Sequence, residues 1–223
     1  MLVIDPVLSP ELRIWRYLTL PAYLDFLTRQ ALYFSSVESL HESDPWEGAL
    51  WPQHHTELRQ ALSLSPEAAK DLSGHFERVH RPLTFVCCWH QNEFESAAMW
   101  DLYSQREGVA IQSTLGSLTH SFPNLKEGHV RPVQYVEPDS ENQAPINFTK
   151  RPSFRHEQEL RIQAVLVGPD LRGEYADVNI SALVQSVYVN PKAKRWVADA
   201  IASTTEKLNF RLPIIHSSLY SPR

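Results

Sequence analysis

The chain has 223 residues, of which 43% are hydrophobic, 10% aromatic and 21% charged. This composition excludes a largely disordered chain, because so much apolar surface has to be buried in a packed core. The formal net charge of −5 gives no overall attraction for phosphate backbones, although a local basic patch could still bind nucleic acid.

The length and the cysteines bound the class of protein further. Residues 1–223 are expected to form a single domain, since the length does not require two independent cores. Cys87 and Cys88 are adjacent in an apolar run and cannot join distant segments, which indicates a reducing, cytoplasmic compartment. The N-terminus lacks the pattern of a secretion signal, and no apolar run approaches the roughly 20 residues that cross a bilayer, so we expect no membrane insertion.

The first half of the chain alternates strands and helices. A period of two predicts a strand over residues 14–18, Pro21 opens a short helix, and a second strand follows over residues 31–35. Residues 43–48, Ser-Asp-Pro-Trp-Glu-Gly, predict a turn because the residue before proline disfavours helix and glycine permits a sharp bend. Residues 54–80 predict one or two exposed, peripheral helices.

The middle of the chain is richer in strands. Residues 83–89 predict a buried strand, 96–103 a short helix and 108–111 the start of another strand. Residues 130–136 predict a further strand, followed by a polar loop over residues 137–143.

The last third predicts a charged strand and a βαβ-like unit. The strand over residues 156–167 alternates at first and then becomes continuously apolar, as expected if it starts in a cleft and ends in the core. A strand over residues 184–189, a helix from the Asn-Pro pair at 190–191 to about residue 208, and a strand over residues 212–215 follow. The expected fold is α+β, with a mixed, mainly antiparallel sheet and peripheral helices.

The charged strand is the most informative stretch. Side chains alternate along a strand, so Glu157, Glu159 and Arg161 are expected on one face. Two carboxylates placed together could stabilise positive charge on a sugar carbon and accept a proton. The alternative is a solvated edge strand with a surface ion pair.

Three earlier residues are candidate ligand contacts. Arg16 lies between two aromatic residues and could bind a phosphate or carboxylate, or it could simply cover an aromatic neighbour. Tyr33 and Ser35 share one face of the next strand and could supply a stacking ring and a hydroxyl donor, with ordinary strand packing as the alternative.

Metal and cysteine chemistry are less well supported. Asp44, Trp46 and Glu47 form an acidic cluster on a loop, but a turn in which Asp44 bonds its own backbone and Trp46 fills the core is the preferred interpretation. The adjacent cysteines and His90 lack the spacing of a zinc site, so no metal is expected. Met99, Trp100 and Tyr103 share a helical face that is expected to pack in the core.

Short motifs follow one another in a fixed order along the chain. They are Trp-Arg-Tyr-Leu at 15–18, Leu-Tyr-Phe-Ser at 32–35, Asp-Pro-Trp-Glu-Gly at 44–48, Ala-Met-Trp-Asp-Leu-Tyr at 98–103, Gly-Val-Ala-Ile at 108–111, and Lys150 followed by Glu-Gln-Glu-Leu-Arg-Ile at 157–162. This ordered set resembles a bacterial family catalogued as domain of unknown function 2971, and the resemblance spans most of the chain.

A looser resemblance concerns mono-ADP-ribosyltransferases, which also carry an early Arg strand, a Tyr and Ser strand and a late Glu-x-Glu strand. It implies that Arg16 holds the phosphates or ribose of NAD, Tyr33 faces the nicotinamide, Glu159 stabilises an oxocarbenium-like transition state and Glu157 activates the acceptor. The candidate set for binding NAD, the substrate, comprises Arg16, Tyr33, Ser35, Trp100 and Arg161.

Three functions stay open at this point. The first is an NAD-consuming transferase or glycohydrolase that acts on protein or nucleic acid, as a toxin or phage-defence effector. The second is a binding module without enzymatic activity, in which Arg16, the Asp44 loop and Arg161 recognise a nucleotide or another anionic ligand. The third is a metal-dependent hydrolase or nuclease that uses Asp44, Glu47 and Glu157.

Overall fold

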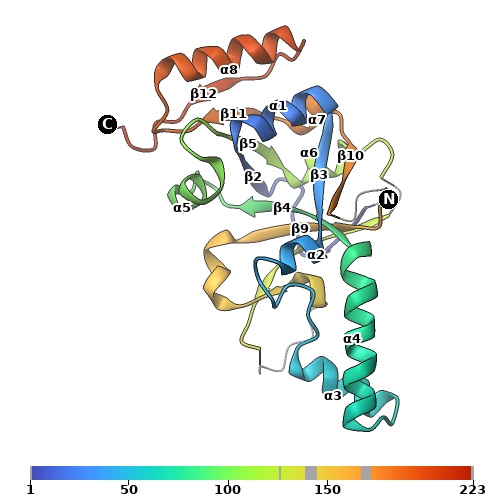
Figure 1. Cartoon of the computed structure of the whole chain (residues 1–223). Coiled ribbons are helices and arrows are strands. Elements are labelled where there is room, and N and C mark those ends of the chain that lie inside the picture. The colour runs from blue at the N-terminus through green and yellow to red at the C-terminus, as the bar shows by residue number, and fades with distance from the viewer. Residues whose placement is uncertain (1, 126, 139–144, 167–171, 222–223) are drawn as a thin grey trace. The chain divides into compact units, whose positions relative to one another are not determined.

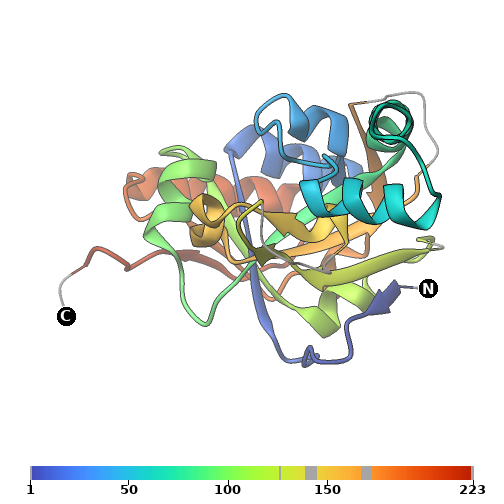
Figure 2. The ribbon, with the colours of Figure 1, turned by 90° about the horizontal axis from the view of Figure 1, so that it is seen from below.

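The computed structural model describes residues 2–125, 127–138, 145–166 and 172–221. They form a mixed α+β structure with a mainly antiparallel sheet, as predicted (Figure 1). The chain divides into two compact units. The first unit comprises Met1–Leu32, Cys88–Lys126 and Tyr175–Arg223, and the second comprises Tyr33–Cys87 and Glu127–Glu174. Figure 2 shows the same ribbon turned by 90°.

The first unit is built on strands in the order β4-β2-β5-β11-β12. Its strands are β2 (Arg13–Leu18), the second half of β4 (Phe85–Gln91), β5 (Val109–Thr114), β11 (Ser186–Val189) and β12 (Ile214–His216), with β1 (Leu2–Ile4) at the start of the chain. β2 pairs antiparallel with β4 and with β5, and β5 pairs antiparallel with β11. β11 and β12 are parallel, with Val187 opposite Ile214.

Two helices of the first unit begin within one residue of the predicted starts, at Leu20 and Ala97, whereas the helices Leu115–His120 and Ile180–Leu183 were not predicted. The helices of this unit are α1 (Leu20–Arg29), α5 (Ala97–Met99), the π-helical η1 (Trp100–Ser104), α6 (Leu115–His120), α7 (Ile180–Leu183) and α8 (Arg195–Lys207). The Thr19 hydroxyl caps α1 by accepting a hydrogen bond from the Ala22 amide. Because α8 connects the parallel strands β11 and β12, the predicted βαβ unit is confirmed.

Two details of these helices differ from prediction. Helix α8 begins at Arg195 rather than at Pro191, because the side-chain nitrogen Nδ2 of Asn190 donates to Ser104 Oγ and to the Gln105 carbonyl oxygen, and Asn190 does not cap a helix. The turn after Met99 is π-helical, which changes the face that each side chain presents. Met99 and Trp100 join the predicted core, but Tyr103 is 43% exposed.

The second unit contains shorter strand pairs. β6 (Gly128–Pro132) pairs antiparallel with β9 (Glu159–Ala164), and β7 (Gln134–Tyr135) pairs parallel with β8 (Thr149–Lys150). The boundary between the units falls within β3 (Ala31–Ser36) and within β10 (Gly173–Asp177), so each strand has residues in both units. β3 pairs antiparallel with the start of β4. Its helices are α2 (Val37–His41), α3 (Pro52–Ala61), α4 (Pro66–Leu83) and the 3-10 turns η2 (Ile146–Phe148) and η3 (Pro152–Glu157).

Two predicted strands of the second unit are shorter than expected. The strand predicted over residues 130–136 is interrupted at Val133, whose amide bonds the Glu159 carbonyl outside the β6–β9 ladder. The strand predicted over 156–167 covers only Glu159–Ala164, and Val165, expected in the core, is 69% exposed. Most of the polar loop predicted over 137–143 lies outside the described residues.

Within the described residues neither cysteine forms a disulfide; Cys87 is buried and Cys88 half-buried. Among the described helices, none combines the length and the apolar character of a membrane span.

Candidate functional site

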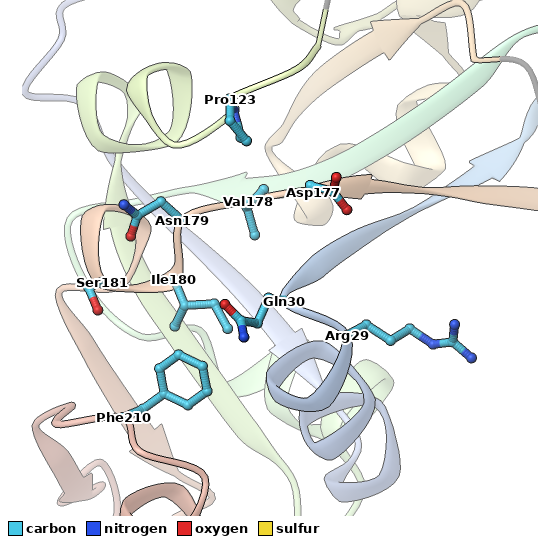
Figure 3. A pocket seen from close by; sticks show the side chains of 9 residues that line it. All are labelled: Arg29, Gln30, Pro123, Asp177, Val178, Asn179, Ile180, Ser181 and Phe210. Atoms are coloured by element: carbon cyan, nitrogen blue, oxygen red, sulfur yellow. The ribbon is translucent and has the colours of Figure 1, made fainter.

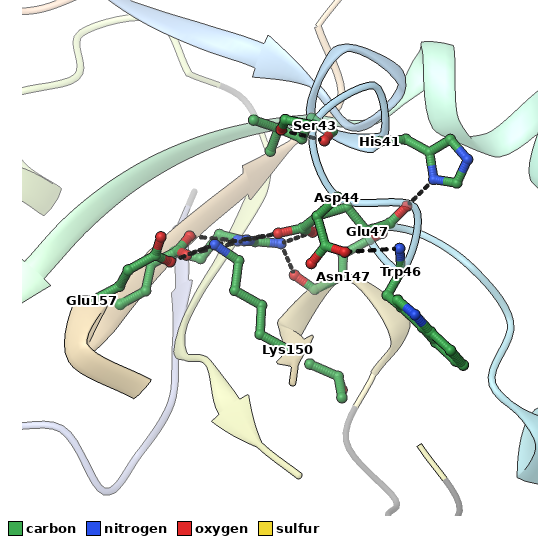
Figure 4. A network of polar contacts seen from close by, with 12 residues as sticks. His41, Ser43, Asp44, Trp46, Glu47, Asn147, Lys150 and Glu157 are labelled. Carbon is green, nitrogen blue, oxygen red and sulfur yellow. Dashed lines mark hydrogen bonds and ion pairs between the residues drawn. The ribbon is translucent and has the colours of Figure 1, made fainter. Parts of the chain in front are cut away.

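Five charged side chains meet in the second unit and form what we call the charged cluster (Figure 4). Its members are Glu47 from the loop after α2, Lys150 from β8, Glu157 at the end of η3, and Glu159 and Arg161 from β9. The cluster unites two motifs that lie more than a hundred residues apart in the sequence, the turn at 43–48 and the charged stretch at 157–161.

Glu157 is placed in the cluster by a 3-10 turn and not by the strand that the sequence predicted. It is the last residue of η3 and not part of a strand, because Gln158 adopts a left-handed conformation with φ 38° and ψ 52° between η3 and β9. The expectation that alternation places Glu157 beside Glu159 was therefore wrong. Only Glu159 and Arg161 share a strand face, and Lys150 brings Glu157 to them.

Arg161 is fully buried and organises the cluster. Its Nε and Nη2 donate to the two carboxylate oxygens of Glu159 at 2.7 and 3.2 Å, and its Nη1 and Nη2 donate to those of Glu47 at 3.1 and 3.0 Å. Nη1 also donates to the Asn147 carbonyl oxygen at 2.7 Å. These contacts use all five N–H donors of a guanidinium, so Arg161 fixes the positions of two carboxylates at once.

Lys150 is the second cation of the cluster. The pairing of β8 with β7, with Lys150 opposite Tyr135, sets its backbone position. Its ammonium nitrogen lies 2.6 Å from Glu157, 2.8 Å from Glu159 and 3.3 Å from Glu47. Only 12% of its side chain is exposed, so the carboxylates meet a largely desolvated positive charge.

The loop that supplies Glu47 is a tight turn, as predicted. The Asp44 carboxylate accepts a hydrogen bond from the Trp46 amide at 3.2 Å and also pairs with Arg151 at 2.8 Å. Gly48 has φ 63°, which a side chain would strain. Trp46 is only half-buried, and the tryptophan that fills the core here is Trp51, which is fully buried. The expectation for Trp46 was wrong in this respect.

Polar groups around the cluster hold it in place and leave two atoms unpaired. The Asn147 amide nitrogen lies 2.9 Å from His80 Nε2 and 3.3 Å from Gln163 Oε1, and burial lowers the pKa of His80. Within the described residues, Asn147 Oδ1 and Arg151 Nε are buried without a hydrogen-bond partner. Buried atoms of this kind are rare in proteins and often mark a site for water or a ligand.

Tyr135 supports the start of β9. Its hydroxyl accepts a hydrogen bond from the Glu159 amide at 2.8 Å. Burial raises the pKa of Tyr135 well above its ordinary value of 10, against the lowering effect of that bond. Tyr135 therefore remains protonated at physiological pH.

The remaining predicted site residues of the second unit lie on β3. Tyr33 and Ser35 are both half-buried, between fully buried neighbours, and so do share one face. Gly173 packs against the Tyr33 ring so closely that an added Cβ would lie 2.1 Å from the hydroxyl. The ring is thus held against backbone on one side.

Arg16 and Trp100 belong to the first unit. Arg16 donates to the Cys88 carbonyl oxygen at 2.9 Å and lies 6.0 Å from the Trp89 ring. Trp100 is 1% exposed and its indole nitrogen donates to Glu95 at 3.0 Å. These contacts anchor both side chains within the first unit.

Sequence reasoning did not select Lys150, Asn147 or Arg151 as site residues. Lys150 belongs to one of the short motifs, but β8 has only two residues, and so few residues give no periodic pattern that would identify a strand. The described residues contain no group of three or more His, Cys, Asp or Glu side chains arranged to hold a metal ion.

Comparison with known proteins gives no assignment. No protein-family model, curated protein or solved structure matches the chain.

Proposed function

We propose that the charged cluster is the catalytic centre of an enzyme that cleaves the glycosidic bond between nicotinamide and ribose in NAD. The ADP-ribose would pass to water or to a protein or nucleic-acid acceptor. The proposal includes an ADP-ribosyltransferase-like fold, membership of the family resembled by the motifs, and a role as a cytoplasmic bacterial toxin or phage-defence effector.

One observation carries this proposal: Glu159 is held by two cations at once. Arg161 Nε lies 2.7 Å from one carboxylate oxygen and Lys150 Nζ lies 2.8 Å from the other. Two contacts of this kind fix the direction of the carboxylate before any substrate arrives. A fixed, ionised carboxylate suits a transition state that carries positive charge on a sugar carbon.

Glu157 is suited to the second role, that of a base. Its side chain is the more exposed of the two, at 9% compared with 4% for Glu159. When the C1′–N bond breaks, the bonding electrons leave with neutral nicotinamide and the ribose becomes oxocarbenium-like. The acceptor oxygen or nitrogen then bonds C1′, and its proton passes to Glu157.

Within this proposal, Tyr33 and Ser35 contact the substrate and Arg161 acts as a positioning residue. The donors of Arg161 are engaged with Glu47, Glu159 and Asn147, so its support for catalysis is the placement of Glu159. The proposal also keeps Trp100 and Arg16 among the residues that contact NAD, with Arg16 at the phosphates or ribose as the resemblance implies.

A nucleotide-binding module is a second candidate, favoured by the buried Arg151 Nε beside Asp44, which has no hydrogen-bond partner among the described residues. An N–H group in that position suits an anionic oxygen. Mass spectrometry of the protein incubated with NAD separates the two candidates. Bound, intact NAD without any free nicotinamide would support the module and contradict the enzyme.

The two carboxylates can be tested separately. Glu159→Gln is expected to abolish nicotinamide release, whereas Glu157→Gln is expected to slow acceptor attack more than NAD binding. Glu42→Gln is the matched control, because Glu42 lies in the same unit with a 60% exposed side chain. Unchanged NAD turnover by a folded Glu159→Gln variant would overturn the proposal.

A further inference from the structure

A pocket of about 540 Å³ lies in the first unit (Figure 3). All of its lining residues belong to the first unit, so the pocket shares no residue with the charged cluster of the second unit. Its volume falls within the range of about 300–1,000 Å³ that is usual for small-molecule sites. We propose that this pocket binds the adenosine part of an adenine nucleoside or nucleotide.

The apolar part of the pocket suits a flat ring. Val178 and Ile180 are 4% and 1% exposed and supply an aliphatic surface. The half-exposed Phe210 ring completes this apolar surface. Its backbone position is set after the end of α8, where Asn209 is left-handed with φ 68° and the Phe210 amide donates to the Thr205 carbonyl oxygen at 3.1 Å. A nucleic-acid base stacks favourably on an aromatic ring of this kind.

The Gln30 side chain supplies the recognition of the base. Gln30 ends α1 in a left-handed conformation with φ 54°, and its carbonyl oxygen accepts from the Val178 amide at 2.8 Å. Figure 3 shows its side chain beside Ile180 and Phe210. Within the described residues, the Gln30 side-chain amide makes no hydrogen bond, so its donor and its acceptor both remain for a ligand.

An amide matches adenine better than guanine. Adenine presents an adjacent donor and acceptor on one edge, which an amide can meet with two hydrogen bonds. The same edge of guanine presents two acceptors, which suit Arg or Lys instead. With the N6–N7 edge of the base facing Gln30, the amide therefore pairs with adenine and not with guanine.

Two charged residues at the pocket define the rest of the ligand. The Asp177 carboxylate is exposed and makes no ion pair with the described residues, and a carboxylate accepts hydrogen bonds from ribose hydroxyls. Arg29 is held elsewhere, by Asp25 at 2.7 Å and over the Tyr175 ring at 4.4 Å. Phosphate groups should consequently add little to affinity, and adenosine should bind about as well as AMP.

Titration calorimetry of the full chain with adenosine, AMP and guanosine tests the inference. Adenosine and AMP are expected to bind with similar affinity, and guanosine at least about tenfold more weakly. Gln30→Ala and Phe210→Ala should each weaken adenosine binding about tenfold or more. Phe94→Ala is the matched control, because Phe94 is a 76% exposed aromatic residue of the same unit outside the pocket.

Three outcomes would overturn the inference: no binding of adenosine to the wild-type chain, equal binding of guanosine, or full affinity in the folded Gln30→Ala variant. Circular dichroism establishes folding, and Gln30→Ala serves where Phe210→Ala fails to fold. Glu159→Gln is expected to retain adenosine binding. The failure of this site and the failure of the proposed function are thus distinguishable.

Discussion

Arg161 and Glu47 form a bidentate ion pair, with Nη1 3.1 Å from one carboxylate oxygen and Nη2 3.0 Å from the other. The two residues are 114 positions apart, and both are almost inaccessible to solvent. This pair ties the turn after α2 to β9, and the same guanidinium orients Glu159. The shape of the cluster therefore depends on a residue outside the charged stretch.

Glu47→Gln is expected to destabilise the protein by about 1–3 kcal/mol, since the two remaining carboxylates of the cluster still face its two cations. The substitution keeps the shape of the side chain but leaves Arg161 without one of its two buried counter-charges. Glu42→Gln, which breaks the exposed pair between Glu42 and Arg172, should change stability by less than about 1 kcal/mol. Urea unfolding of both variants provides the measurement, and equal losses would contradict a special role for the buried pair.

Gly48→Ala is expected to lower stability by about 2–4 kcal/mol, through backbone strain and overpacking. A Cβ at this position would lie 2.2 Å from Val37 Cγ1, in a residue with φ 63°. Gly74→Ala is the matched control, since Gly74 lies inside α4 and its Cβ would approach only the flexible end of Arg78, at 3.4 Å. That control should be neutral or gain up to about 1 kcal/mol. Thermal unfolding compares the two, and a stable Gly48→Ala variant would show that the turn can relax.

Acid is expected to weaken the second unit through His80. Burial lowers the pKa of His80 below its ordinary value of 6.5, so the unfolded chain takes up a proton before the folded chain does. The contribution of His80 to stability is thus complete above about pH 6.5 and declines as the pH falls through the lowered folded pKa. His80→Gln should flatten the loss of stability between about pH 7 and 5, measured by denaturant unfolding. An unchanged slope would contradict this assignment.

Tyr23→Phe is expected to destabilise the first unit by about 1–3 kcal/mol, the usual cost of an unsatisfied buried polar group. The Tyr23 hydroxyl lies 2.8 Å from the Thr205 hydroxyl, and Thr205 is 1% exposed, so its removal leaves a buried polar group unpaired. Adding Thr205→Val should recover part of the loss, because no unpaired hydroxyl then remains. Urea unfolding of the single and double variants checks this, and a double variant less stable than Tyr23→Phe would contradict it.

Local sequence patterns predicted most of the elements but not all of their ends. Periodicity and caps located β2, α1 and β3, and the parallel pair β11 and β12 flanks a helix as expected. The prediction for Glu157 failed because Gln158 takes a left-handed conformation that glycine or asparagine usually marks. The predicted start of α8 was wrong because the Asn190 side chain donates a hydrogen bond to Ser104, in a distant segment, and does not cap a helix.

The candidate site could be predicted only in part. Glu159 and Arg161 share a face because they are two residues apart on a strand, which the sequence alone implies. Their contact with Glu47 and Lys150 depends on long-range packing, for which single-sequence patterns hold no information. The prediction that residues 1–223 form one domain, and the roles assigned to Arg16 and Trp100, stay predictions.

Release of nicotinamide from NAD tests the central claim most directly. The purified wild-type chain is incubated with NAD, and free nicotinamide is followed by chromatography beside Glu159→Gln and Glu42→Gln. The account predicts release by the wild type and by Glu42→Gln, and a loss of at least about 100-fold in Glu159→Gln with folding retained. Absence of release by the wild type, or equal rates in the wild type and the Glu159→Gln variant, would contradict it.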